Sequence, residues 1–135
     1  LARLRNDLAQ RVTEGDRFVI GGDWNIAPSS ADVWDVDVFD ENSTHVSVPE
    51  REAMAAITDV GLRDTFRERY GDADDLFSWW DYRGGNFHKR KGMRIDYLLA
   101  TPPLADAAVS DLIDRNARKG TKPSDHAPVL AYYDV

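Results

Sequence analysis

Two stretches of the chain carry apolar residues at helical spacing. The first predicts a helix over 1–12, where apolar residues recur every three or four positions. The second predicts a helix over 48–61, because Pro49 suits a first helical turn and Gly61 suits a helix end. The apolar positions of the first repeat are Leu1, Leu4, Leu8 and Val12.

Shorter apolar stretches, bounded by turn-forming residues, are typical of strands. Between the first strand and the second long helix runs a polar loop, 26–47, whose length indicates a functional loop or a disordered one. A turn with a short helix is expected at 101–108. The pattern predicts an α/β (α+β) fold with one sheet covered by helices on one face. The predicted strands are 17–23, 75–82, 93–100, 108–115 and 127–135.

The composition excludes several classes of protein. The 135 residues form a single domain or part of one, and with 42% hydrophobic residues they can build a core. The absence of cysteine excludes disulfide scaffolds, thiolate metal sites and cysteine nucleophiles. No apolar run reaches the ~18 residues of a membrane helix, so we expect no membrane partner and a cytoplasmic protein. The chain opens inside a helical pattern without an initiator Met, which suggests a fragment.

The charge is unevenly distributed. The formal net charge of −7 argues against a polyanionic partner. However, the stretch 83–94 carries five basic residues and 115–122 carries four, so together they hold nine of the 17 Lys and Arg and no acid. This segregation is either a chance of loop composition or a functional basic surface, and the neighbouring aromatic residues favour the surface.

Polar residues adjoin the predicted strands where apolar ones are expected. Asp23 and Asn25 follow the first strand and, two residues apart in extended backbone, face the same side. They form either an ordinary turn or part of a site. Asp96 lies among apolar neighbours, and a buried carboxylate there needs a partner, either Arg94 or a group in a site.

Two more stretches allow both a structural and a functional interpretation. Asp125 and His126 are adjacent just before the last strand, where they form either a capped turn or a site in which one faces a metal and the other a substrate. Trp79 and Trp80 belong to an aromatic run that is typical of a sheet core. Because neighbours on a strand point to opposite sides, we expect the two indoles to line different surfaces.

Taken together, these residues predict a site that hydrolyses phosphodiesters. Such a site needs an activated water, a charge clamp and assistance to the leaving oxygen. Carboxylate and carboxamide oxygens suit Mg²⁺, with Mn²⁺ as an alternative. A histidine held by a carboxylate can bind phosphoryl oxygens.

Five segments occur in an order and at a spacing that resemble one known family. They are "GGDWNIAP", "PERE", "FSWWDYR", "GMRIDYLLA" and "KPSDHAPV". From about residue 10 to 133 the chain resembles the C-terminal half of the exonuclease III class of abasic-site endonucleases, within the endonuclease/exonuclease/phosphatase superfamily. The implied fold is one half of a four-layer α/β sandwich, a mainly antiparallel sheet with helices on one face. The implied activity is Mg²⁺-dependent hydrolysis of double-stranded DNA at abasic sites and at blocked 3′ ends, in base excision repair.

The resemblance also implies roles for individual residues. Asp23 matches the aspartate that orients or deprotonates the attacking water, and Asn25 matches the asparagine that binds the scissile phosphate. Asp96 matches the partner of the catalytic histidine, which is His126. Asp125 matches a metal ligand, and the metal set implied is Asp125, Asp23 and Asn25.

The remaining matches concern DNA. The apolar pocket for a flipped abasic sugar corresponds to Trp79, Met93 and Ile95, with Trp80 beside it. The residues expected to contact the DNA backbone are Arg83, Lys89, Arg90 and Lys91.

The resemblance stops short of a complete enzyme. The family's first half supplies further ligands, including a metal-binding glutamate, and none can be assigned here. We therefore expect one exposed sheet face, and either a domain excerpt, a partner N-terminal half or self-association. Activity of the chain alone should be low or absent. The alternatives are an RNA or phospholipid phosphodiesterase or phosphatase of the same superfamily, or a non-catalytic binding or assembly module.

Overall fold

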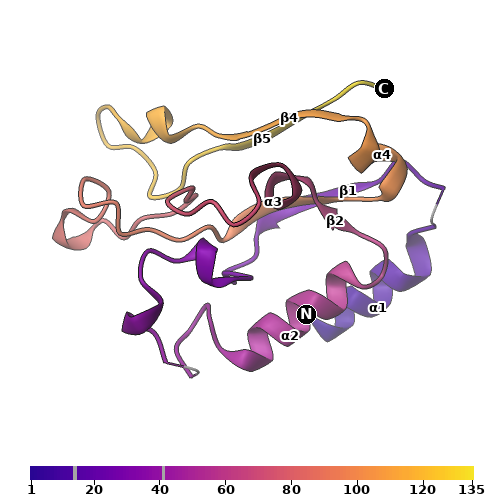
Figure 1. The fold of residues 1–135 in the computed structure, drawn as a ribbon, viewed down its shortest axis with the longest axis horizontal. Coiled ribbons are helices and arrows are strands. Elements are labelled where there is room, and N and C mark those ends of the chain that lie inside the picture. Colours follow the sequence, from indigo (N-terminus) through magenta and orange to yellow (C-terminus); the bar gives the residue numbers. More distant parts are fainter. Residues whose placement is uncertain (14, 41) are drawn as a thin grey trace.

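The computed structural model describes residues 1–13, 15–40 and 42–135 and gives an antiparallel α/β fold (Figure 1). The helices are α1 (Ala2–Arg11), α2 (Val48–Thr58), α3 (Thr65–Tyr70) and α4 (Pro102–Asp106). The strands are β1 (Val19–Asp23), β2 (Arg63–Asp64), β3 (Asp96–Ala100), β4 (Ala108–Ile113) and β5 (Val129–Tyr133). Short 3₁₀ turns occur at Ser30–Asp32, Val36–Val38, Arg83–Gly85 and Arg115–Arg118. Within the described residues, no helix is long and apolar enough to cross a membrane.

The strands form two sheets rather than the single sheet predicted. One has the order β1-β3-β2 and the other pairs β4 with β5, all antiparallel. The predicted strand 75–82 is wrong: within it Trp79 alone forms β-bridges, one to Met93 and one to His126. Backbone hydrogen bonds on both sides of Trp79 connect the two sheets at this end. The Met93 N–H donates to the Trp79 carbonyl (2.9 Å), and the Ala127 N–H donates to the Ser78 carbonyl (2.7 Å).

The helices α1 and α2 cover one face of the β1-β3-β2 sheet (Figure 1). Alternation along β3 directs Tyr97 and Leu99 to this face, where both are buried. The core there also contains Leu8 of α1 and Ile57 of α2. Burial of these side chains is what attaches the two helices to the sheet.

The opposite face of this sheet is only partly covered. Val19 of β1 has 42% of its surface exposed. Leu98 of β3 lies across Gly21, since a Cβ on that glycine would be 2.1 Å from Leu98 Cδ2. The side chains of Asp23 and Asp96 belong to this same face by alternation. The expected exposed sheet face is therefore present, and the predicted site residues lie at its edge.

Both long helices begin and end near the predicted positions. α2 starts with a capping box in which Ser47 and Glu50 satisfy each other's backbone N–H groups. It ends at Thr58, and Gly61 follows with a positive φ of 105°, which favours glycine. The segment β2–α3 was not predicted, because two strand residues and six helical ones are too short for a periodic signal.

Candidate active site

Asp23 and Asp96 face each other across two neighbouring strands. They are register partners where β1 ends and β3 begins. His126 lies on the same face of the sheet as these two side chains, just before β5. A β-bridge between its backbone and that of Trp79 holds it there. Ligand atoms of Asp23, Asp96 and His126 all lie within 4.8 Å of one another. Residues that are 30 to 103 positions apart thus form one cluster.

His126 is oriented by Asp96. Its Nδ1 lies 2.8 Å from Asp96 Oδ2, and because a carboxylate only accepts, Nδ1 carries the proton. Burial raises the pKa of Asp96, the hydrogen bonds from His126 and Ser78 oppose that rise, and the charge of Asp23 adds to it. The other ring nitrogen, Nε2, lies 3.9 Å from Asp23 Oδ2. That separation exceeds a hydrogen bond and leaves Nε2 available for a ligand.

Arg94, the structural alternative as partner of Asp96, is engaged elsewhere. Its guanidinium is 1% exposed and pairs with Asp32 at 2.6 Å and Asp64 at 2.7 Å. Burial alone would raise the pKa of Asp32, but Arg94 and Arg67 hold it below its ordinary value. This network fixes the loop 26–47 to the sheet and leaves Asp96 to His126.

Asn25 adopts an uncommon backbone conformation that turns it back toward Asp23. Its φ is 55°, a left-handed value that asparagine tolerates better than most residues. Its backbone N–H donates to Asp23 Oδ1 (2.9 Å) and its carboxamide Nδ2 to Asp23 Oδ2 (3.2 Å). The turn interpretation of "GGDWN" is therefore correct, and the turn brings the side chains of Asp23 and Asn25 together, whereas their role in a site stays a prediction. The carboxamide oxygen of Asn25 remains for a ligand.

His45 is a contact of the site that the sequence did not reveal. Its Nδ1 lies 2.6 Å from the backbone carbonyl of Asn25, so Nδ1 is the protonated nitrogen. Its ring centre lies 6.3 Å from that of Trp79. His45 sits in the middle of a polar loop, and no spacing in the sequence links it to the strands. It contacts the backbone carbonyl of Asn25, whereas Asp23 contacts the backbone N–H and the carboxamide of Asn25.

Asp125 faces an indole rather than the three-residue cluster. Trp79 Nε1 donates to Asp125 Oδ2 at 3.0 Å. The structure thus places Asp125 beside the cluster but not among the ligand atoms that lie within 4.8 Å. Its role as a metal ligand stays a prediction.

The predicted apolar pocket residues differ in access. Trp79 is half-buried and packs with Met93 and Ile95, which are 5% and 2% exposed. Trp80 is 1% exposed and belongs to another cluster, with Phe87. The expectation that the two indoles line different surfaces is confirmed. In this arrangement only Trp79 of the four presents a partly exposed side chain beside the site.

Most basic side chains of the stretches 83–94 and 115–122 contact a carboxylate or an aromatic ring of the same chain. Arg83, 90% exposed, pairs with Asp81 at 2.6 Å, and Arg90 pairs with Asp75. Lys91 Nζ lies 4.5 Å from the Trp34 ring centre. Arg94, Arg115 and Arg118 also stack over aromatic rings. Among the described residues, Lys89, Lys119 and Lys122 have neither an ion pair nor an aromatic ring beneath the charge, so fewer basic side chains of the two stretches are free than the sequence predicted.

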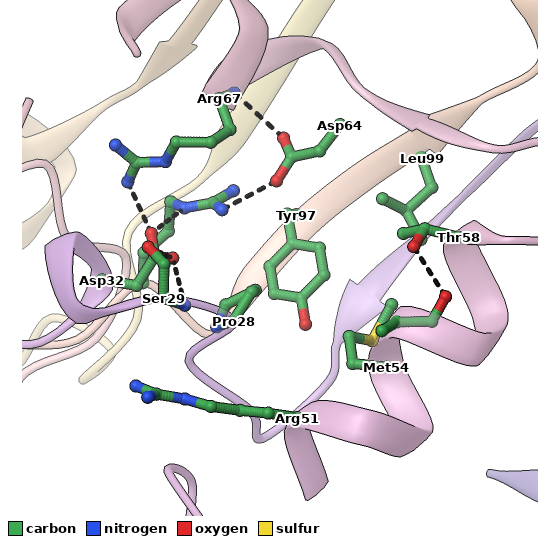
Figure 2. A pocket seen from close by; sticks show the side chains of 12 residues that line it. Pro28, Ser29, Asp32, Arg51, Met54, Thr58, Asp64, Arg67, Tyr97 and Leu99 are labelled. Atoms are coloured by element: carbon green, nitrogen blue, oxygen red, sulfur yellow. Dashed lines mark hydrogen bonds and ion pairs between the residues drawn. The ribbon is translucent and has the colours of Figure 1, made fainter. Parts of the chain in front are cut away.

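A separate cavity of about 270 Å³ lies on the helix-covered side of the sheet (Figure 2). Met54 and Tyr97 line it, together with Asp32, Asp64 and Arg67 of the ion-pair network. None of the predicted site residues borders it. Asp32, Asp64, Arg67 and Arg94 are paired within the ion-pair network and Arg51 donates to the Ala27 carbonyl, which indicates a structural role.

The cluster fits a magnesium ion in part. Asp23 offers carboxylate oxygens and Asn25 an amide oxygen, the hard ligands that Mg²⁺ prefers. Asp96 and His126 Nδ1 are committed to each other. The described residues of the cluster therefore provide only one side of a six-oxygen shell.

The family model described as "Endonuclease/Exonuclease/phosphatase family" matches residues 1–126. The chain is similar to Exodeoxyribonuclease III of Haemophilus influenzae, 36% identical over 98% of this chain and 51% of that protein. It also resembles the solved 3′ phosphatase NExo from Neisseria bound to a product DNA hairpin, with a TM-score of 0.94, 35% identity and 99% and 51% coverage. An AP endonuclease from Archaeoglobus fulgidus matches with a TM-score of 0.89, 34% identity and 99% and 52% coverage. The chain spans about half the length of these relatives.

Proposed function

The chain belongs to the endonuclease/exonuclease/phosphatase family, and we propose that it provides one half of the active site of a metal-dependent DNA phosphodiesterase of the exonuclease III type. The observation that carries the proposal is the cluster of Asp23, Asp96 and His126, with Asn25 held against it. The proposed substrates are double-stranded DNA with abasic sites or blocked 3′ ends. The names of the similar proteins, an exodeoxyribonuclease, a 3′ phosphatase and an AP endonuclease, support this choice.

Each residue of the cluster has a chemical task in the proposed reaction. Asp23 accepts a proton from the attacking water, whose oxygen bonds to phosphorus while the bond to the leaving sugar oxygen breaks. In its imidazolium form His126, held through Nδ1 by Asp96, donates from Nε2 to a phosphoryl oxygen and stabilises the charge that develops there. Asn25 donates the second hydrogen of its Nδ2 to another phosphoryl oxygen. When bound, Mg²⁺ or Mn²⁺ neutralises phosphate charge, and we propose Asp23, Asn25 and Asp125 as its ligands from this chain.

The remaining ligands would come from a second half of the fold. We propose that this half covers the sheet face on which Val19, Leu98 and the site residues lie. Self-association through the same face is the alternative for the chain alone. In either case the isolated chain should have little activity.

The reaction can be tested with two DNA substrates. The chain, combined with the N-terminal half of a relative, is incubated with a duplex holding one abasic analogue and with a duplex ending in a 3′ phosphate, in Mg²⁺ or in EDTA. We expect Mg²⁺-dependent products that fall about 100-fold or more in Asp23→Asn, because loss of a general base costs at least that factor. Asp59→Asn, an equal charge change on an exposed residue, is the matched control and should leave the rate unchanged.

Other outcomes would redirect the proposal. Cleavage of RNA or of a phospholipid headgroup in preference to both duplexes would keep the family and refute the DNA substrate. An inert complex, with both halves folded and associated, would favour a binding or assembly module.

A further inference from the structure

A groove lies between two loops that leave the candidate site side by side. It is a cavity of about 400 Å³ bordered by the segments 81–88 and 118–123, and we call it the Tyr82 groove. Its volume is in the range that binds a nucleotide-sized group. Both loops come from the basic stretches of the sequence, and the second of these has no task in the proposed reaction.

The walls of the Tyr82 groove are held together by specific contacts. Arg118, 6% exposed, stacks over Phe87 at 4.8 Å and over Tyr82 at 5.4 Å, and donates to the Ser124 carbonyl. Its Nε has no hydrogen-bond partner within the described part of the chain. The Tyr82 hydroxyl donates to the Pro123 carbonyl at 2.8 Å, so it crosses from one loop to the other.

The lining is positive in a chain whose net charge is −7. Among the described lining residues, Asp81 is the one carboxylate, and it pairs with Arg83. The hydrogen bonds from Arg83 lower the pKa of Asp81 to about 2. The lining cations are Arg118 and the exposed Lys119. Lys122 is exposed on the same loop. The Tyr82 ring, on a residue 62% exposed, adds a surface on which a base can stack.

The position of the groove relates it to the candidate site. Tyr82 follows Trp79 by three residues, Pro123 precedes His126 by three, and Trp79 and His126 are themselves bridged. Three residues span at most about 10 Å. A DNA strand advances about 3.4 Å per nucleotide, so the groove lies within about three nucleotides along a strand whose reacting phosphate is at His126.

We propose that the Tyr82 groove binds the sugar–phosphate backbone of the DNA within about three nucleotides of the reacting phosphodiester. Lys119 and Lys122 contact phosphates, and Tyr82 packs against a sugar or base. The proposal rests on the proposed function for its substrate. It adds a contact surface on the loop 118–123, which the roles implied by the family resemblance do not include.

The test measures binding apart from cleavage. Affinity for a duplex with one abasic analogue is measured in EDTA as a function of KCl concentration, with the complemented chain. We expect the double variant Lys119→Ala/Lys122→Ala to reduce the slope of log K against log salt by about 1 to 2, since each phosphate contact contributes about 0.9. The double variant Arg3→Ala/Arg5→Ala removes the same charge from exposed positions on α1 and should keep the parent slope.

Duplex length supplies the second readout. When the duplex ends at the analogue on the groove side, the parent and the lysine variant should have equal affinity. An unchanged slope, or an equal deficit with every duplex length, would overturn the proposal and leave the groove to another partner, such as an acidic protein segment. Failure of the proposed function is distinct, because the complemented parent would then neither bind nor cleave the duplex.

Discussion

Asn25 shows how a single residue serves both the fold and the site. Its left-handed backbone turns the chain at the end of β1, and the same turn aims its carboxamide at Asp23. That conformation is held by contacts with Asp23 and with His45. We therefore expect His45 to act as a positioning residue for Asn25.

Replacing His45 tests this positioning role. We expect His45→Ala to lower kcat by about fivefold, because one hydrogen bond is worth roughly 1 kcal/mol and 1.36 kcal/mol is a factor of ten in rate. His45→Asn keeps a donor at the place of Nδ1 and should recover most of the rate. Steady-state kinetics of the complemented chain measure both. Equal losses in the two variants would show that the hydrogen bond to Asn25 is not what matters.

Asp32 is the residue on which the loop 26–47 depends. Its carboxylate is fully buried between Arg94 and Arg67. We expect Asp32→Asn to lower the free energy of unfolding by about 3–5 kcal/mol, since Arg67 loses its carboxylate partner and the buried Arg94 keeps only Asp64. Urea unfolding measures the loss, and the exposed Asp37→Asn should change stability by less than about 0.5 kcal/mol.

The stability difference between the parent and Asp32→Asn should also depend on pH. The folded-state pKa of Asp32 lies below its ordinary value of 3.8. Its contribution is therefore complete above the unfolded pKa and is lost as the pH falls through the lower folded pKa. The stability difference between parent and Asp32→Asn should stay constant at neutral pH and shrink below pH 3.8. A difference that grows on acidification would contradict the ion-pair assignment.

At the scale of elements, the segment around Trp79 connects the two sheets. It bridges Met93 on one side and His126 on the other, so its position determines how far His126 lies from β3. Gly92 is where this segment packs most tightly. A Cβ there would lie 2.5 Å from Trp80 Nε1 and 2.7 Å from the Trp79 carbonyl oxygen.

We expect Gly92→Ala to destabilise the chain by about 1–3 kcal/mol through overpacking. Because the clash involves the Trp79 backbone, it should also displace His126 and reduce cleavage by the complemented chain. Gly22→Ala adds a Cβ with no heavy atom within 4 Å and serves as the stability control. Thermal unfolding measures the stability of both variants. A Gly92→Ala protein as stable as the parent would refute the packing argument.

Elements with a clear period were predictable and elements without one were not. The helices α1 and α2 and the strands β1, β4 and β5 lie close to the ranges that periodicity predicts. The aromatic run 75–82 has strand-like composition, but its backbone pairs only at Trp79, and composition cannot reveal pairing. Polar groups next to apolar strands marked Asp23, Asp96 and His126 as candidates, and their roles came from the family resemblance. The His45 contact and the Arg90–Asp75 pair depend on tertiary contacts and leave no pattern in the sequence, whereas Arg83 pairs with Asp81 only two residues away.

At the scale of the whole molecule, one face of the β1-β3-β2 sheet stays partly exposed beside the candidate site. The helix-covered face is buried by α1 and α2, whereas the face carrying Asp23 and Asp96 is partly exposed. Similar proteins are about twice as long, and we propose that the half of their fold that this chain does not cover packs against this face. We therefore expect the chain and an N-terminal half to associate through this face and to assemble one site between them.

The most direct test of that claim is the nicking rate of the assembled halves. A duplex with one abasic analogue is incubated in Mg²⁺ with the chain, with the N-terminal half of a relative, and with both together. We predict that only the mixture nicks the duplex, and that His126→Ala in this chain lowers the rate of the mixture by about 10²–10³, the cost of removing one group that stabilises transition-state charge. Undiminished nicking with His126→Ala would contradict the assignment of this chain to the catalytic site.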